Sequence, residues 1–360
     1  MTKLTFVCPC YNHEKYVLDF LNSLLKQTDS NWELIIIDDC SLDDSVARIK
    51  TIQDDRIRLF QNNFNQGINA SFSKGIGIAN TELISFVASD DMLYSDYVET
   101  MFDMFEQNQE IAACYTPLSH MNLQGKLLST STSLPTDKSE MEIFAQMFLN
   151  ENLLPSPGMV FRKSILAPYL PLNSGMFQYS DYQMHFYLLF KNKIKFLDKA
   201  LVQYRISPKS ACARSPEAIL REDIETEELM NTVLHLIGKD KASFLKYFGD
   251  YSLINNNEIY EETIPFWFGR LAMASPIAAR QKWGLKIIRD FIACEDHMKF
   301  LQQYYNFSYK DYLGYASLIS ASSDQNSQTI QKYKQKIKKL KKIRFMLVII
   351  CLIMGVCLCL

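Results

Sequence analysis

The strongest constraint on the fold of this chain is the alternation of short apolar runs with helical stripes over its first 117 residues. Residues 4–8 and 34–38 are continuous runs of β-forming residues, which is typical of parallel strands buried on both faces. Between them, apolar residues recur at the spacing of a helix that packs on a sheet. The same order continues, with strands expected at 57–60, 83–88 and 111–116 and a helix at 68–80. It predicts an α/β domain with a mostly parallel sheet and helices on both faces.

The pattern loosens after residue 117 and becomes mainly helical after residue 214. The segment 215–324 is rich in aromatic residues and yields no functional interpretation. Before it we expect helices at 139–149 and 181–190, a strand at 156–162 and one or two strands within 195–205. We therefore divide the chain into the two halves of a sheet domain, a helical region, a basic helix and an apolar tail: 1–117, 118–214, 215–324, 325–344 and 345–360.

The distribution of charge excludes one class of partner and indicates another. Eight of the 38 Lys and Arg residues lie in 332–344, which has no acidic residue. The rest of the chain, 1–331, therefore carries 30 basic and 40 acidic residues, a net charge of −10. An acidic body is a poor match for the phosphates of nucleic acid, so we expect no nucleic-acid partner.

The basic segment predicts contact with a membrane surface. Its apolar residues recur at the 3 and 4 spacing of an amphipathic helix, and the sixteen residues 345–360 that follow carry no charge. Sixteen helical residues reach ~24 Å, somewhat short of a ~30 Å hydrocarbon core. We expect 345–360 to be a membrane anchor with 1–344 on the cytoplasmic side, because positive charge flanks it. The alternative is a C-terminal helix buried in a protein partner.

The cysteines favour a reducing compartment. There are nine of them, without a CxxC pair or a Cys–His pair at metal-ligand spacing. Cys8 and Cys10 share one face of the first expected strand, where we expect them to pack rather than react. The N-terminus enters that strand without the design of a signal peptide. Together these features predict a cytoplasmic location.

Polar side chains gather where three of the expected strands end. The first ends in "PCYN" (9–12), the second in "DD" (38–39) and the fourth in "SDD" (89–91). Open parallel sheets bind ligands at this edge. Two adjacent carboxylates repel each other unless a cation or strong donors lie between them. One such pair is explained equally well by helix capping, but two pairs opposite a tyrosine loop favour a ligand site.

The chemistry that fits these groups is recognition of a nucleoside diphosphate. An aromatic ring would stack on the base, carboxylates would bind the base and ribose, and Asp91 would hold a divalent cation on the phosphates. The glycine-containing segment "NQGINASFSKGIG" has neither a GxGxxG nor a Walker pattern, which argues against a dinucleotide-binding dehydrogenase and a P-loop kinase. It is typical of a loop that enters a helix, with Lys74 near the phosphates.

These motifs, in this order and spacing, resemble the donor half of glycosyltransferase family 2. The match is close over 3–117, in "VCPCYNHEKYV", "ELIIIDDCSLDDS" and "NQGINASFSKGIGIANTELISFVASDD". It continues more loosely to about residue 212 through "SPGMVFRKS", "YSDYQMHFYLLF" and "LVQYRISPKS". The resemblance implies the Rossmann-like GT-A fold, with 1–117 binding a nucleotide-sugar and 118–214 an acceptor.

The resemblance also implies roles on the donor side. Tyr11 would stack on uracil or another base, with Pro9 and Cys10 lining that loop. Asp39 would accept a hydrogen bond from the base N–H.

The remaining implied roles concern the sugar, the metal and the acceptor. Asp90 would face the ribose, and Asp91, in the DXD-like position, would coordinate Mg²⁺ or Mn²⁺. Asp181, in "YSDYQ", would be the general base that deprotonates the acceptor hydroxyl.

The sequence departs from the family pattern in three places. The residue before Lys74 is often Asn and here is Ser73, which weakens the expected phosphate contact. The acidic pair usual at the base motif is reduced to Asp181 by Ser180. No QxxRW motif occurs, which argues against a processive synthase. His185 follows Asp181 at i+4, where it either touches the base or packs in the core.

The resemblance therefore predicts a metal-dependent, inverting, non-processive glycosyltransferase. The donor would be a nucleotide-sugar, expected to be UDP-linked, and the acceptor a hydroxyl of a surface glycan or lipid-linked acceptor. Such an enzyme would lie on the cytoplasmic face of the bacterial inner membrane, anchored by its tail. The alternative is a membrane-anchored nucleotide- or sugar-binding scaffold that has lost catalysis, which the missing acid at position 180 would support.

Overall fold

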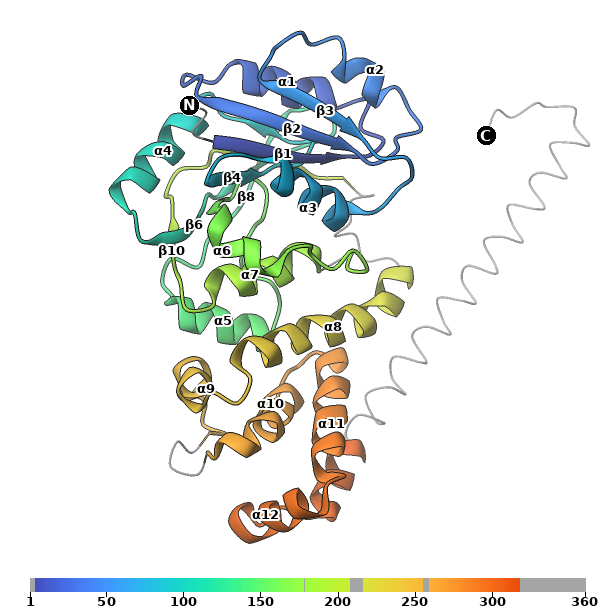
Figure 1. Ribbon diagram of the computed structural model, residues 1–360, viewed down its shortest axis with the longest axis vertical. Helices are drawn as coiled ribbons and strands as arrows, with labels where there is room; N and C mark the ends of the chain where they lie inside the picture. Colours follow the sequence, from blue (N-terminus) through green and yellow to red (C-terminus); the bar gives the residue numbers. More distant parts are fainter. Residues whose placement is uncertain (1–3, 178, 208–215, 255–258, 318–360) are drawn as a thin grey trace, which may run out of the picture.

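A computed structural model describes residues 4–177, 179–207, 216–254 and 259–317. Figure 1 shows a sheet domain at one end and helices α8 to α12 at the other. The main sheet has seven strands in the order β10-β6-β9-β4-β1-β2-β3, and its neighbours are parallel except where β9 pairs with β4 and β6. Its strands are β1 (Leu4–Cys10), β2 (Trp32–Asp38), β3 (Ile57–Gln61), β4 (Leu83–Phe86), β6 (Ile111–Tyr115), β9 (Val160–Arg162) and β10 (Lys193–Phe196).

Helices cover both faces of this sheet, as the sequence predicts. Alternate side chains of the strands feed two apolar cores, one with α1 and α4 and the other with α3, α5 and α7. Cys8 and Cys10 are buried in the first core, so their expected packing is confirmed. The helices are α1 (Val17–Leu25), α2 (Ser45–Ile49), α3 (Ile68–Ile78), α4 (Tyr97–Gln107), α5 (Glu140–Leu149), α6 (Lys163–Leu166) and α7 (Ser180–Leu189).

A second, four-stranded sheet lies beside the first and was not predicted as a unit. Its order is β5-β11-β7-β8, with bounds Met92–Leu93, Val202–Arg205, Leu118–Met121 and Leu127–Thr132. Most side chains of β8 are exposed, so its sequence lacks the apolar alternation that identifies a strand. β5 begins directly after Asp91 and pairs with β11, which ends at Arg205. The small sheet therefore fixes the segment that follows the second acidic pair.

The helical region packs on the acceptor half of the sheet domain. α8 (Pro216–Ile237) lies against α7, and α9 (Lys241–Phe248) lies against α5. Aromatic rings join the two regions, as where Phe148 of α5 meets Phe248 and Phe268. The last three helices are α10 (Ile264–Met273), α11 (Ala278–Ile292) and α12 (Glu295–Tyr305). The two regions therefore share one apolar core.

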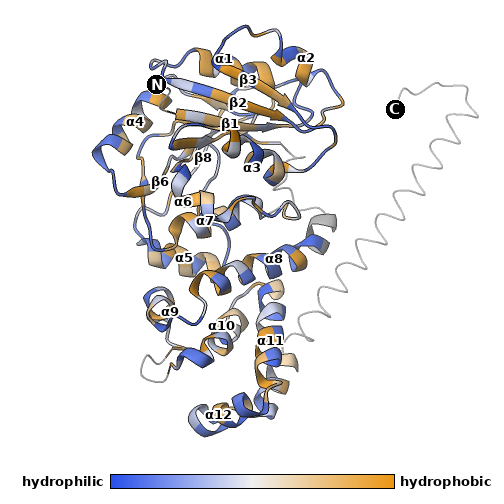
Figure 2. Cartoon of the chain, in the orientation of Figure 1, coloured by the Kyte–Doolittle hydropathy of each residue, from blue (hydrophilic) through white to orange (hydrophobic). Residues whose placement is uncertain are grey.

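The hydropathy of the elements matches this packing. Figure 2 shows hydrophobic residues concentrated in the central strands, while the helices mix both kinds. Among the described residues, the structure contains no helix with both the length and the apolar character needed to span a bilayer. The expected basic helix at 325–344 and apolar anchor at 345–360 lie outside the described residues.

Candidate active site

The loops that follow β1, β2 and β4 meet at one edge of the main sheet. Cys10 is in register with Asp38, and the Asp39 N–H donates to the Cys10 carbonyl at 2.8 Å. Nδ1 of His13, after β1, lies 2.6 Å from the Ser89 hydroxyl, after β4. The structure thus brings together the three polar strand ends singled out in the sequence.

The first of these loops presents an open aromatic ring. Tyr11 is 41% exposed, so its ring is free to stack on a planar ligand, and Pro9 is half-buried beside it. Cys10 is buried in the core, where burial raises the pKa of its thiol to about 11. Cys10 can therefore line this loop only through its backbone.

The acidic pair after β2 divides into two different environments. Oδ1 of Asp39 accepts hydrogen bonds from Asn62 Nδ2 at 2.8 Å and from the Gln66 N–H at 2.9 Å. Its Oδ2 accepts from the Gly67 N–H at 2.8 Å, just before α3. Asp39 therefore ties down the loop that enters α3.

Asp38 has the spare acceptor of this pair. Its Oδ2 accepts from the Ser41 N–H at 3.2 Å, whereas its Oδ1 is buried and accepts no hydrogen bond in the described structure. Lys74, which we expected near phosphates, donates from Nζ to Asn62 Oδ1 at 2.7 Å and so joins the Asp39 network. Sequence reasoning placed the pair at the site but missed Asp38 as the carboxylate with an unused oxygen.

The acidic pair after β4 is held by an arginine that the sequence did not indicate. Asp91 is 2% exposed, and its Oδ1 accepts from the Arg205 N–H at 2.8 Å. Nε of Arg205 donates to the Asp90 carbonyl at 2.7 Å, and its NH2 group donates to Asp19 Oδ2 at 3.1 Å. Burial, together with the neighbouring charge of Asp90, raises the pKa of Asp91 well above its usual value. Arg205 ends β11, so only the second sheet brings it here.

The chemistry of this pair permits a divalent cation. The described residues contain no group of three His, Cys, Asp or Glu side chains placed to hold a metal. Magnesium in nucleotide sites needs only one or two carboxylates, since phosphates and waters supply its other ligands. Oδ2 of Asp91 is buried and has no hydrogen-bond partner among the described residues, and Asp90 is only half-buried. These two carboxylates meet that minimum.

The predicted general base, Asp181, lies on the acceptor half, in α7. Asp181 is half-buried in the first turn of α7, and its Oδ2 accepts from the Ser156 hydroxyl at 2.5 Å. Two residues after Ser156, the Gly158 N–H donates to the Phe86 carbonyl at the end of β4 at 2.8 Å. Through Ser156, Asp181 is therefore connected to the segment that bonds to the end of β4, the strand that the SDD residues follow.

His185 is fully buried and reaches Asp181 only through Ser156. Its Nε2 lies 3.2 Å from the Ser156 hydroxyl, and its Nδ1 lies 3.0 Å from the Tyr115 hydroxyl. Burial lowers the pKa of His185 to about 4, so the ring is neutral at pH 7. The sequence left open whether His185 packs in the core or touches Asp181. The ring packs in the core and is linked to Asp181 through the Ser156 hydroxyl.

The helical region supports the segment that carries Asp181. The Tyr179 N–H, at the start of α7, donates to Glu225 Oε2 of α8 at 2.8 Å. Gln183 Nε2 donates to the Thr232 hydroxyl, also on α8, at 2.8 Å. These contacts give a structural role to a region that the sequence left without interpretation.

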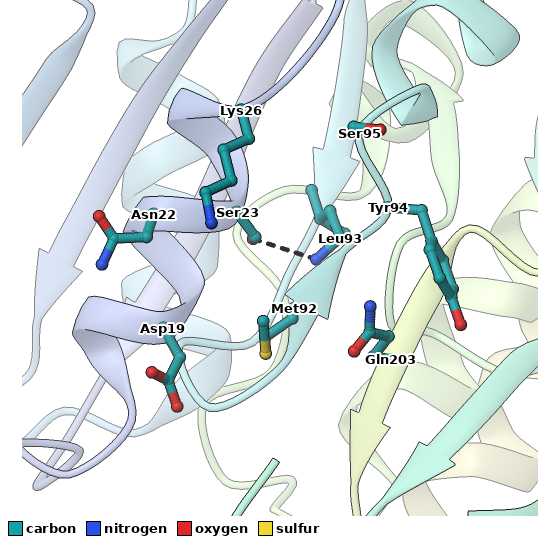
Figure 3. Close-up of a pocket in the computed structure, with 9 residues that line it drawn as sticks. All are labelled: Asp19, Asn22, Ser23, Lys26, Met92, Leu93, Tyr94, Ser95 and Gln203. Carbon is teal, nitrogen blue, oxygen red and sulfur yellow. Dashed lines mark hydrogen bonds between the residues drawn. The ribbon is translucent and has the colours of Figure 1, made fainter. Parts of the chain in front are cut away.

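A cavity of about 600 Å³ lies between α1 and the small sheet. Figure 3 shows its lining, in which the Ser23 hydroxyl accepts from the Leu93 N–H at 3.1 Å. Neither Tyr11 nor Asp181 lines it. It adjoins the site through Asp19, which accepts a hydrogen bond from Arg205, and through Met92, which follows Asp91, but the candidate functional groups lie at the strand ends.

An α/β fold with acids and an open aromatic ring at the carboxyl edge of a mainly parallel sheet has its polar groups where open sheets of this class bind nucleotides and other ligands. Residues 5–169, a little under half of the chain, match the family model described as Glycosyl transferase family 2, in agreement with the resemblance seen in the sequence.

Relatives of known sequence share this domain. An uncharacterized glycosyltransferase of Rickettsia felis is 34% identical over 131 residues, which cover 36% of this chain and 21% of that protein. The Escherichia coli UDP-Glc:alpha-D-GlcNAc-diphosphoundecaprenol beta-1,3-glucosyltransferase WfgD is 30% identical over 105 residues, which cover 29% of this chain and 42% of that protein. The matched part thus spans about a fifth of the Rickettsia protein.

The crystal structure of Staphylococcus aureus TarS 1–349 in complex with UDP has a similar fold. The TM-score is 0.52 at 18% sequence identity, and the match covers 80% of this chain and 89% of that one. This likeness shows a GT-A-like fold that extends into the helical region.

Proposed function

We propose that this protein transfers a sugar from a nucleotide-sugar, expected to be UDP-linked, to a hydroxyl of a glycan or lipid-linked acceptor, with inversion and without processivity. The observation that carries the proposal is that Asp181, half-buried in the first turn of α7, is bonded to Ser156 in the segment that contacts the end of β4, the strand that the SDD residues follow. One oxygen of Asp181 is held by Ser156, and the other accepts no protein hydrogen bond among the described residues. A carboxylate in this state is suited to accept a proton from a hydroxyl.

The donor would lie on the first half of the domain. Tyr11 would stack on the base, Asp38 or Asp39 would accept its N–H, and Asp90 would face the ribose. Asp91, with Asp90 beside it, would hold Mg²⁺ or Mn²⁺, which would offset charge on the leaving diphosphate. The proposal of a UDP-linked donor draws support from TarS, which binds UDP, and from WfgD, which is named for a UDP-glucose donor.

The chain's own groups would carry out the transfer by one displacement. The acceptor oxygen bonds to the anomeric carbon as its proton passes to Oδ1 of Asp181, and the bond from that carbon to the nucleoside diphosphate breaks on the opposite face. General-base assistance of this kind contributes ~10²–10⁴ in rate. A lipid-linked acceptor agrees with the diphosphoundecaprenol substrate in the name of WfgD. We also propose attachment to the cytoplasmic face of a bacterial inner membrane through 325–360, on the basis of its sequence.

The test is a screen of nucleotide-sugars with the purified full-length protein. We expect slow, metal-dependent release of the nucleoside diphosphate from one donor without acceptor, and faster release once a suitable acceptor is added. A protein that binds nucleotides tightly but releases none from any donor would be the scaffold rather than the enzyme.

A further inference from the structure

Asp181 is the outer end of a chain of four side chains that runs into the core. The Ser156 hydroxyl contacts Asp181 Oδ2 at 2.5 Å and His185 Nε2 at 3.2 Å, and His185 Nδ1 meets the Tyr115 hydroxyl at 3.0 Å. Ser156 is 3% exposed, and the other two inner residues are 0% exposed. The four come from β6, the loop before β9 and α7, so only the tertiary fold assembles them.

An ionised Asp181 fixes the direction of every hydrogen in this chain. A carboxylate only accepts, so the Ser156 hydroxyl gives it its single hydrogen. The serine oxygen can then only accept from the histidine ring, which must carry its hydrogen on Nε2. Nδ1 of His185 is then an acceptor and takes the hydrogen of the Tyr115 hydroxyl. All three hydrogens point toward Asp181.

The neutral state of the ring makes this order possible. An imidazolium donates from both nitrogens and could not accept from Tyr115. Burial lowers the pKa of His185 to about 4, and Asp181 is the charged group that acts on the ring. The Leu154 carbonyl is a further acceptor for it. The Ser156 hydroxyl already bonds to Asp181, so its second contact, with His185, is not required for packing alone.

We propose that Ser156, oriented by His185 and Tyr115, is the positioning residue of the general base. It holds Oδ2 of Asp181 so that Oδ1 alone faces the acceptor hydroxyl. No proton travels along the chain: the acceptor's proton stays on Oδ1. This inference rests on the function proposed above.

The first experiment reads the order of hydrogens without any turnover. Full-length protein with ¹⁵N-labelled histidine is examined by NMR, and His185 is identified among the five histidines by its loss in His185→Gln. We expect a neutral ring with hydrogen on Nε2, unchanged between about pH 7 and about pH 5.5. A ring with hydrogen on Nδ1, or a charged ring, overturns the proposal even if the protein proves to be the proposed enzyme.

The second experiment measures how catalysis depends on pH. Ser156→Ala should lower kcat about tenfold through loss of alignment. It should also move the acid limb of the kcat/KM profile to higher pH, because the carboxylate loses a hydrogen-bond donor. UDP affinity should not change. Ser156→Thr keeps the hydroxyl and should restore the profile, whereas His185→Phe should shift it in the direction of Ser156→Ala.

A second buried serine supplies the matched control. Ser275 is 2% exposed and donates to the Leu149 carbonyl at 2.6 Å, so Ser275→Ala removes a comparable bond without touching Asp181. It should lower Tm and leave the pH profile in place. An unshifted profile in Ser156→Ala and His185→Phe, with Asp181→Asn inactive, overturns the positioning role alone. If the wild type released nothing from any donor, the proposed function would be refuted. The NMR result would still decide the direction of the hydrogen bonds among Asp181, Ser156, His185 and Tyr115.

Discussion

At the scale of single residues, the acids of the site differ in how much of their bonding capacity the protein itself uses. Asp39 accepts three protein hydrogen bonds, whereas Asp38 and Asp91 each keep one buried oxygen that has no partner in the described part of the chain. Buried polar atoms are rarely left unpaired, so such oxygens mark places where a ligand can complete the bonding. Asp38 and Asp91 are therefore the acids with capacity for a donor, and Asp39 is the acid that shapes the loop.

The neighbouring acids Asp38 and Asp39 can be separated by experiment. Asp39→Ala leaves two backbone N–H groups and Asn62 without their acceptor, so we expect the free energy of unfolding to fall by about 3 kcal/mol. Asp38→Asn should leave stability nearly unchanged and weaken UDP binding about tenfold, because it alters the free acceptor. Urea denaturation and calorimetric titration measure the two effects. If Asp38→Asn binds UDP as wild type does and Asp39→Asn does not, the base contact belongs to Asp39.

The position of the acid pairs at the edge of the sheet could be predicted from the sequence, but the hydrogen bonds of each carboxylate within a pair could not. Each pair follows an apolar strand, and this local signal places it at the edge of the sheet. What each carboxylate binds depends on Gln66, Gly67 and Arg205, which lie far along the chain. Such partners leave no local periodicity, so the sequence signal ends at the pair.

His185 makes stability depend on pH in a defined window. Its pKa is 6.5 when unperturbed and about 4 in the folded protein. Between these two pH values the unfolded chain therefore binds a proton at His185 and the folded protein does not. Its contribution is complete above about pH 6.5 and is lost as the pH falls toward about 4. Between about pH 7 and about pH 5 we expect wild type to lose ~2 kcal/mol more than His185→Gln. Urea denaturation at both pH values measures this, and parallel losses in the two proteins would contradict it.

At the scale of elements, the alternating strands and helices of the main sheet could be predicted from the sequence, whereas the small sheet could not. The apolar runs and stripes of β1 to β4 and of α1, α3 and α4 reflect burial on both sides or one side of a sheet. β5, β7 and β8 lack such a pattern because they are short or exposed. β5 and β7 pair with β11, which is distant from them in the sequence, and this pairing determines where Asp91 lies.

Helix α3 offers a matched pair of glycines that tests its packing. A Cβ at Gly75 would lie 2.3 Å from Val7 Cγ1 of β1, whereas a Cβ at Gly77 would meet nothing within 4 Å. Gly75→Ala should lower the free energy of unfolding by about 1–3 kcal/mol through overpacking. Gly77→Ala should raise it by about 0.5–1 kcal/mol, since alanine favours a helix. Equal effects in thermal unfolding would mean that α3 does not approach β1 this closely.

At the scale of the whole molecule, the helical region supports the helix that carries Asp181. It shares a core with the acceptor half, and α8 receives hydrogen bonds from the start of α7 and from Gln183. A glycosyltransferase that acts on a lipid-linked acceptor would also need to stay near a bilayer. We propose that the segment beyond the described helices provides this, and its sequence of basic then apolar residues is the basis of that proposal.

Truncation separates anchoring from chemistry. Deletion of 327–360 removes all eight basic residues of the segment and the apolar tail. Each basic residue is worth ~1 kcal/mol at most near an anionic leaflet, so the shortened protein should move to the supernatant after ultracentrifugation. It should retain metal-dependent release of the nucleoside diphosphate. A truncated protein that still sediments with membranes would place the attachment elsewhere.

The central claim is that Asp181 accepts the acceptor's proton while a separate group of acids holds the donor. The most direct measurement pairs calorimetric titration of UDP and Mn²⁺ with a transfer assay on Asp181→Asn, with Asp91→Asn as the control. Asp91→Asn should lose metal-dependent tightening of UDP and turnover together, because an amide is a poor ligand for a hard cation. Asp181→Asn should bind UDP as wild type does, while transfer falls by ~10²-fold or more. Near wild-type transfer by Asp181→Asn would contradict the account.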